Sequence, residues 1–172
     1  MTSHLLVALA LAGCGSESTS FRSTDQVDSG RTPAPAVYEV RGTQVRVWSN
    51  GGYISNTDEP MTHVAFEITN PGPRPLELAS EALQLSVFDR NGVALVAPFV
   101  ALTPLGPAHV PVPKGTTTLD AYFRLPVRPR VVAHMDVRWA IRVDDALQTV
   151  TTSFVRDDDF PIAEPPTAPL GS

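Results

Sequence analysis

The sequence predicts an all-β protein, a single antiparallel β-sandwich of about seven strands. Hydrophobic and polar residues alternate with a period of two in several windows, which places the hydrophobic ones on one face of a strand. Turn signals separate these windows at intervals of roughly 8–12 residues, as in antiparallel sandwiches. The chain also contains 17 prolines, which would interrupt most candidate helices.

The expected strands follow one another with consistent inward and outward phases. In the clearest, residues 137–143, Val137, Trp139 and Ile141 face inward while Arg138 faces outward. The inward positions expected in the other strands are Val45 and Val47, then Val64, Phe66 and Ile68, then Leu83, Leu85 and Val87, and then Leu119, Ala121, Phe123 and Leu125. Residues 147–155 supply a last strand after a turn at Asp144-Asp145.

Turn chemistry supports these strands. Asn91-Gly92 is a preferred pair for a two-residue hairpin in which both central residues have positive φ. The run Asn70-Pro71-Gly72-Pro73 ends a strand, because proline cannot donate to a β-ladder. Residues 97–115, with five prolines, predict a crossover between sheets with an edge segment near 110–112.

The N-terminus matches a bacterial lipobox, in which a cysteine thiol accepts a diacylglycerol after signal cleavage. The sequence Leu11-Ala12-Gly13-Cys14 follows an apolar stretch at 5–11, too short for a transmembrane helix. Residues 1–4 lack the Lys or Arg usual in such signals. An ordinary signal peptide and a short buried helix are the alternatives.

The domain boundaries follow from this assignment. We expect a signal peptide at 1–13, a lipidated Cys14 opening a disordered tether at 14–36, the sandwich at 37–160 and a disordered tail at 161–172. Gly15 rather than aspartate follows the cysteine, so in a host with two membranes we expect the outer membrane, facing the periplasm or the surface. The net charge of −5 argues against nucleic acid.

Two stretches carry a family resemblance. Residues 63–72, ending in Asn70-Pro71-Gly72, and residues 83–92, ending in Asp89-Arg90-Asn91-Gly92, resemble bacterial Ig-like lipoprotein domains, as do residues 112–119 and 123–126. The resemblance spans roughly residues 40–155 and implies an immunoglobulin-like fold, export and no known catalysis. A related bacterial proteinase-inhibitor family has a similar Asn-turn-Leu signature.

Known catalytic patterns are missing from the sequence. It contains no Gly-x-Ser-x-Gly elbow, no His-Glu-x-x-His helix and no phosphate-binding glycine loop. Cys14 is the only cysteine, which excludes cysteine catalysis and disulfides in the exported domain. We therefore expect neither an enzyme nor a bound cofactor.

Two other function classes stay open. Met61, His63, His134 and Met135 pair thioether with imidazole, a donor set that suits copper. A periplasmic copper carrier is therefore one alternative, although these side chains equally fit the surface of a sheet. The second alternative is a protease inhibitor that presents the loop 104–115.

Trp48 is out of phase with Val45 and Val47, so we expect it to be exposed near Tyr53. With the loop expected at 49–53 it would form a contact patch, unless it covers a sheet edge. The sequence thus predicts a membrane-tethered envelope lipoprotein with a non-catalytic binding or assembly module. Its expected partners are the lipid bilayer, through Cys14, and an envelope protein or ligand.

Overall fold

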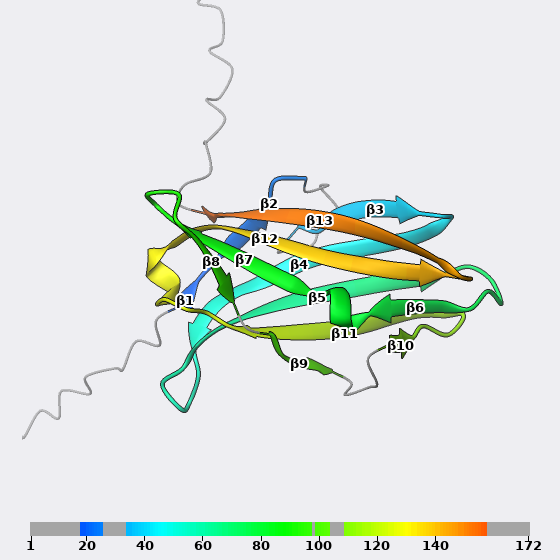
Figure 1. The fold of residues 1–172 in the computed structure, drawn as a ribbon, viewed down its shortest axis with the longest axis horizontal. Coiled ribbons are helices and arrows are strands. Elements are labelled where there is room, and N and C mark those ends of the chain that lie inside the picture. The colour runs from blue at the N-terminus through cyan, green and yellow to red at the C-terminus, as the bar shows by residue number, and fades with distance from the viewer. Residues whose placement is uncertain (1–17, 26–33, 98, 104–108, 158–172) are drawn as a thin grey trace, which may run out of the picture.

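Two antiparallel β-sheets packed face to face form the molecule, as the sequence predicts (Figure 1). The computed structural model describes residues 18–25, 34–97, 99–103 and 109–157. Thirteen strands lie in these residues, more than the seven or so expected. The additional strands come mainly from the segment expected as a tether and from the proline-rich crossover.

Sheet A has six strands in the order β1-β4-β5-β11-β9, with β3 also paired to β4. Because β4 is long, β3 and β1 lie one after the other along the same edge of it, opposite residues 43–47 and 52–53. The strands are β1 Ser18–Thr19, β3 Ala36–Val40, β4 Thr43–Ile54, β5 Pro60–Asn70, β9 Phe99–Thr103 and β11 Gly115–Arg124.

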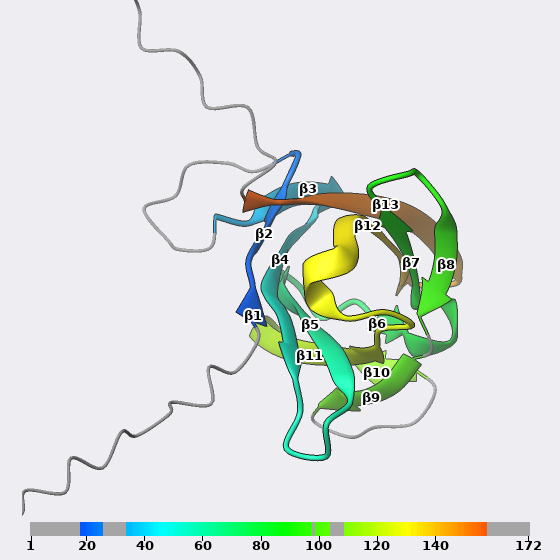
Figure 2. The same cartoon turned by 90° about the vertical axis from the view of Figure 1, so that its left-hand side faces the viewer.

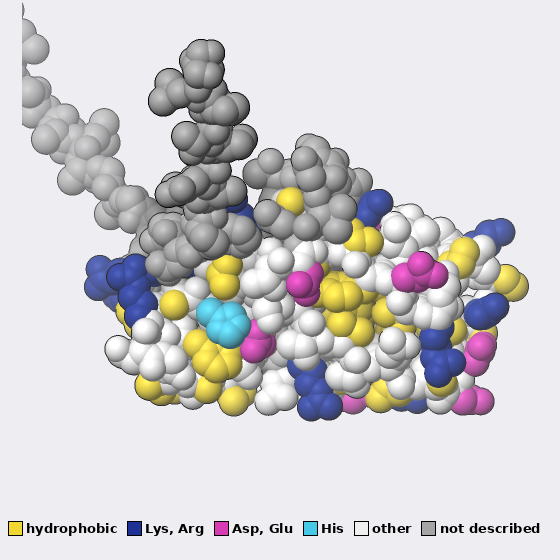
Figure 3. Space-filling model, turned by 90° about the horizontal axis from the view of Figure 1, so that it is seen from above, with side chains coloured by type: hydrophobic (Ala, Val, Ile, Leu, Met, Phe, Trp, Pro, Cys, Tyr) yellow, Lys and Arg dark blue, Asp and Glu magenta, His cyan; other side chains and the backbone are white. Residues whose placement is uncertain are grey.

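Sheet B has seven strands in the order β10-β6-β12-β13-β2, with β7 paired to β12 and β8 to β7. Figure 3 looks onto its outer side near β12 and β13, where polar and hydrophobic side chains are mixed. The strands are β2 Phe21–Ser23, β6 Leu76–Ala79, β7 Gln84–Asp89, β8 Ala94–Ala97, β10 His109–Pro111, β12 Val132–Val143 and β13 Ala146–Arg156.

The core lies between the sheets and has the phases that the sequence predicts. Trp139 is completely buried, its indole NH donates to Thr152 Oγ1 at 3.0 Å, and its ring meets Tyr38 and Phe66 edge to face at centroid distances of 5.5 and 5.8 Å. All inward positions predicted for residues 45–47, 64–68, 119–125 and 137–143 are buried. Arg138, on the opposite side of β12, is exposed.

The expected tether at 14–36 is wrong at residues 18–23, which belong to the sandwich. β2 pairs with β13, and Phe21 is only 2% exposed within the core. β1 pairs with β4 through Ser18 opposite Tyr53 and Thr19 opposite Gly52. The sequence does not predict β2, because a strand of three residues with one hydrophobic side chain, Phe21, gives no detectable alternation in a Ser/Thr-rich segment. The predicted tail at 161–172 lies outside the described residues.

The hairpin turns differ in part from expectation. Only Gly92 of the Asn91-Gly92 pair has a positive φ, and Gly92 N donates to Asp89 O, which makes a type I turn followed by a bulge. The two-residue turn with both central φ values positive is instead Arg41-Gly42, between β3 and β4. The expected turn at Asp144-Asp145 joins β12 to β13, as predicted.

One end of the sandwich is closed by the short 3-10 turn η2, Pro129–Val131, which lies across the opening between the sheets in Figure 2. Pro129 is buried there, and η2 packs against β1, β4 and β5. The other 3-10 turn in the described part, η1 at Ser80–Ala82, joins β6 to β7.

Candidate functional site

The lipobox residues Leu11, Ala12, Gly13 and Cys14 lie outside the described residues. The lipid-anchor assignment therefore stays a prediction. Within the described residues no helix is long and apolar enough to cross a bilayer.

The structure does not bring the four copper candidates together. His63 lies on the outer face of sheet A and His134 on the outer face of sheet B, so the core separates them. Met135 is completely buried in that core, on the opposite side of β12 from His134. Only Met61 and His63 share a face. No group of three or more His, Cys, Asp or Glu side chains that could hold a metal ion occurs among the described residues.

The aromatic residues expected to form a contact patch do lie on one surface. Trp48 and Tyr53 belong to β4, and the register places Tyr53 opposite Met61 and Trp48 opposite Ala65 on β5. Tyr122 on β11 lies opposite His63. We call the outward side chains Trp48, Tyr53, Met61, His63 and Tyr122 the aromatic face.

Partial burial characterises this face. Trp48, Tyr53 and Tyr122 are half-buried, and Met61, which faces outward, is only 8% exposed. Burial, and to a lesser degree the nearby phenol of Tyr122, raise the pKa of Tyr53 above its usual value. Trp48 pairs with Ala65 on β5 and lies on the other side between the pairings of β3, which end at residue 47, and those of β1, which begin at residue 52.

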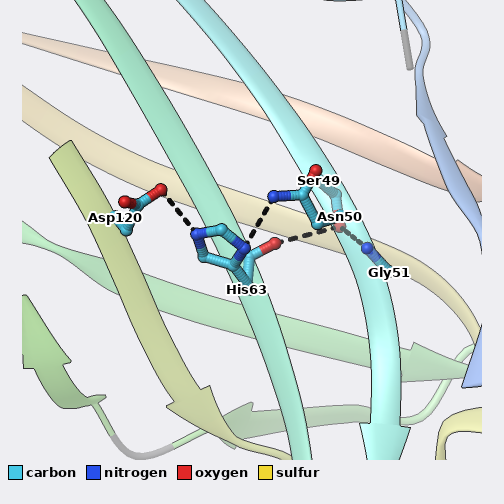
Figure 4. A network of polar contacts seen from close by, with 5 residues as sticks. All are labelled: Ser49, Asn50, Gly51, His63 and Asp120. Carbon is cyan, nitrogen blue, oxygen red and sulfur yellow. Dashed lines mark hydrogen bonds and ion pairs between the residues drawn. The ribbon is translucent and has the colours of Figure 1, made fainter. Parts of the chain in front are cut away.

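His63 is held by a polar contact at each ring nitrogen (Figure 4). Nε2 lies 2.7 Å from Asp120 Oδ1 on β11, and Nδ1 lies 2.7 Å from Asn50 Nδ2 on β4. The ring stacks on Tyr122 with a centroid distance of 4.8 Å and an interplanar angle of 10°. The imidazole therefore ties three neighbouring strands together on the aromatic face.

The stretch expected as a glycine-rich loop at 49–53 is instead a bulge within β4. Ser49 Oγ accepts from Gly51 N at 3.0 Å and donates to His63 O at 3.4 Å, as Figure 4 shows. Gly51 has a positive φ of 92°, and a Cβ there would collide with the carbonyl of Thr19 on β1. Gly51 thus lets β1 approach the strand closely, and Gly52 makes room for Pro129 of η2. The Asn50 side chain contacts His63 from within this bulge.

A second histidine site lies on the outer face of sheet B. His134 Nε2 lies 2.8 Å from Asp136 Oδ1, and Ser153 Oγ donates to the same oxygen at 2.7 Å. The imidazole stacks on Phe88 of β7 with a centroid distance of 4.5 Å. Sequence patterns point to both histidines but to neither carboxylate partner.

The β5–β6 loop, at the end of the sandwich away from η2, has a cleft on each side. The larger, of about 490 Å³, is walled by Pro73, Pro75 and Pro111 and has Arg74 and Lys114 at its rim. Asn70 holds the loop: its amide nitrogen donates to Val112 O at 3.0 Å and its Oδ1 accepts from Gly72 N. Asn70 thus ends β5 by fixing the loop, which explains the Asn-turn signature in physical terms.

The loop 104–115 of the inhibitor hypothesis is described only from residue 109. There His109–Pro111 forms the edge strand β10, paired with β6, close to the edge segment expected at 110–112.

Comparisons of the chain with models of known protein families and with curated protein sequences found no match.

Proposed function

We propose that the protein is a cell-envelope lipoprotein, anchored through Cys14, whose sandwich is a non-catalytic binding or assembly module. The contact surface is the aromatic face of sheet A, and the partner is another envelope protein. The observation that carries this proposal is the gathering of Trp48, Tyr53 and Tyr122 on outward positions of neighbouring strands. Aromatic residues are enriched at protein interfaces because they bury a large area at a low cost in conformational entropy.

The setting of His63 supports a binding surface over a catalytic one. A general base needs a ring nitrogen that can reach substrate, whereas Asp120 and Asn50 occupy both nitrogens of His63. The same contacts fix the ring, so a partner meets a preorganised surface. The copper carrier gains no comparable support, because its four candidate residues are dispersed over two sheets. The loop of the protease-inhibitor alternative is described only from residue 109, so that alternative stays a prediction.

The anchor is tested by the substitution Cys14→Ser. Metabolic labelling with palmitate should label the unchanged protein and leave the variant unlabelled. The variant should keep its circular dichroism spectrum, because Cys14 precedes the first strand of the sandwich. Label that persists in the variant would refute the lipobox.

The contact surface is tested by photo-crosslinking in intact cells. A photoreactive amino acid at position 53 should capture an envelope protein, whereas the same group at position 151, exposed on β13 of sheet B, should not. Trp48→Ala should weaken capture from position 53 if the two residues contact the same partner. Equal capture from both positions would show that the aromatic face is not the contact surface.

A further inference from the structure

The β3–β4 turn carries an arginine where its backbone favours other residues. Arg41 has a positive φ of 52°, and the two other non-glycine residues with positive φ in the described chain are aspartates, Asp58 and Asp144. Asn, Asp and Gly are the residues that tolerate this left-handed conformation, and Asn-Gly is the preferred pair in a turn of this type. The arginine is therefore unfavourable for the turn itself.

No contact within the described residues compensates for the arginine. The Arg41 side chain is exposed and forms no hydrogen bond or ion pair among them. Residues held in unfavourable backbone conformations cluster at functional sites, where the side chain serves a ligand rather than the fold. The Arg41 guanidinium group is accordingly accessible to a ligand.

Arg41 lines a cleft between the β3–β4 turn and the β5–β6 loop, which lie together at the end of the sandwich away from η2 (Figure 1). The cleft has a volume of about 260 Å³, and Arg74 lines it from the loop. Arg74 is exposed, and its side chain also forms no ion pair with a described residue. The lining residues Leu76 and Val143 are each 3% exposed, and no other described residue of the lining is charged. The cleft thus combines two guanidinium groups with apolar side chains.

Acidic residues at the same end of the sandwich do not line this cleft. Glu77 pairs with Arg142 at 3.7 Å and lines the larger cleft across the loop. Asp144-Asp145, in the β12–β13 turn, contacts the β5–β6 loop through its backbone, and Glu39 is exposed on β3. In the described part of the chain none of these carboxylates pairs with either arginine of the cleft. The cleft is therefore distinguished by its lining and not by the net charge of this end.

We propose that the two clefts beside the β5–β6 loop bind an extended segment of a protein partner that carries acidic and apolar side chains. A carboxylate occupies the small cleft between Arg41 and Arg74, and an apolar side chain packs against the prolines of the large cleft. Guanidinium groups bind carboxylates through paired, charge-assisted hydrogen bonds. This site is separate from the aromatic face and does not depend on lipidation of Cys14.

The dimensions of the clefts favour a peptide over a small molecule or a simple anion. The small cleft, of about 260 Å³, is below the range of about 300–1,000 Å³ typical of small-molecule sites, so it suits a single side chain. A free phosphate ion would leave the proline walls of the large cleft uncovered. An acidic residue with apolar neighbours covers both clefts.

The test titrates two capped tripeptides into the isotope-labelled full-length chain in detergent micelles and follows the amide NMR signals. The acidic probe has a glutamate between two leucines, and the neutral probe has a glutamine in its place. We expect the acidic probe to shift the signals of Gly42, Gly72 and Arg74. It should bind about tenfold more tightly than the neutral probe, because only its carboxylate forms charge-assisted hydrogen bonds with both guanidinium groups.

Substitution of Arg41 separates binding from folding. Arg41→Asn should weaken binding of the acidic probe about tenfold and raise the urea midpoint of unfolding, because asparagine suits the left-handed conformation. Arg74→Gln should weaken binding to a similar extent. Arg138→Gln, which removes the same charge from an exposed position on sheet B, should leave binding unchanged.

Three results would overturn the proposal. The first is equal binding of the two probes, or equal binding of the acidic probe to the parent protein and to Arg41→Asn. The second is displacement of the acidic probe by inorganic phosphate at the same concentration, which would show a site for simple anions. The third is a lower unfolding midpoint for Arg41→Asn, which would show that the arginine stabilises the turn.

Discussion

The two histidine sites on the outer faces of the sheets contain the same kinds of side chain but draw them from different numbers of strands. In both, an imidazole stacks on an aromatic ring and Nε2 contacts an aspartate. His63 and Asp120 come from different strands, 57 residues apart, and the His63 side chain is 14% exposed. His134 and Asp136 are two residues apart on one strand, and the His134 side chain is 35% exposed.

This difference separates a long-range contact from a local one. Asn50, His63 and Asp120 join β4, β5 and β11, so their hydrogen bonds form only when sheet A is assembled. The His134–Asp136 contact can form along β12 alone, and only Ser153 and Phe88 extend it to neighbouring strands. We therefore expect His63 to contribute more to the stability of the fold than His134.

The largest loss of stability is expected in the core, at Trp139. Trp139→Ala should lower the free energy of unfolding by about 3–5 kcal/mol, because it leaves a cavity between the sheets and removes the indole that satisfies buried Thr152. Arg138→Ala, at the exposed neighbouring position, should cost less than about 0.5 kcal/mol. Urea melts of both variants measure the difference, and equal costs would mean that the phase of β12 is wrong.

The comparison itself is tested by His63→Ala against His134→Ala. Loss of two hydrogen-bond contacts and a ring stack should cost about 2 kcal/mol at position 63. Loss of one contact and a stack at the more exposed position 134 should cost about 1 kcal/mol. Thermal or urea unfolding of the two variants measures both losses of stability. Equal losses, or a larger loss at position 134, would remove the distinction between the sites.

A smaller effect comes from the β7–β8 turn, which lies beside Phe88 in the second site. Hydrogen bonds, chiefly from Val93 N, hold the pKa of Asp89 below its usual value. Its stabilising contribution is therefore present above the pKa of the unfolded chain, near 4, and is lost as the pH falls through the lowered folded value. Asp89→Asn should make stability less dependent on pH between about pH 5 and 2. Parallel slopes for the variant and the parent protein would contradict this.

The smallest expected effect is none. If His63 and His134 jointly bound Cu(I), the ion at one hundred times its dissociation constant would add about 2.7 kcal/mol. We expect an unchanged unfolding midpoint, because the core separates the two imidazoles. A rise that vanishes in the double variant His63→Ala/His134→Ala would restore the copper carrier.

The predictability of the fold depends on the range of the interactions. The inward orientation of Trp139 and Phe66 follows from the local alternation of hydrophobic and polar residues, because one face of each sheet is buried in the core. The partnership of His63 with Asp120 depends on the register between β5 and β11, which no local pattern determines. At Asn91-Gly92, the Asp89 side chain caps Asn91 N and Val93 N, which favours a type I turn over the turn expected from the Asn-Gly pair alone.

The pairing of β2 with β13 has a consequence for the order in which the protein folds. Thr24 N donates to Ser153 O at 3.0 Å across a separation of 129 residues, so the beginning and the end of the described chain close one sheet. Such contacts form slowly, because a long loop must close before any pairing is gained. Phe21 cannot be sheltered beside β13 until Arg156 has been synthesised. A chain crossing a membrane N-terminus first would therefore stay incompletely folded until its last strand has passed through.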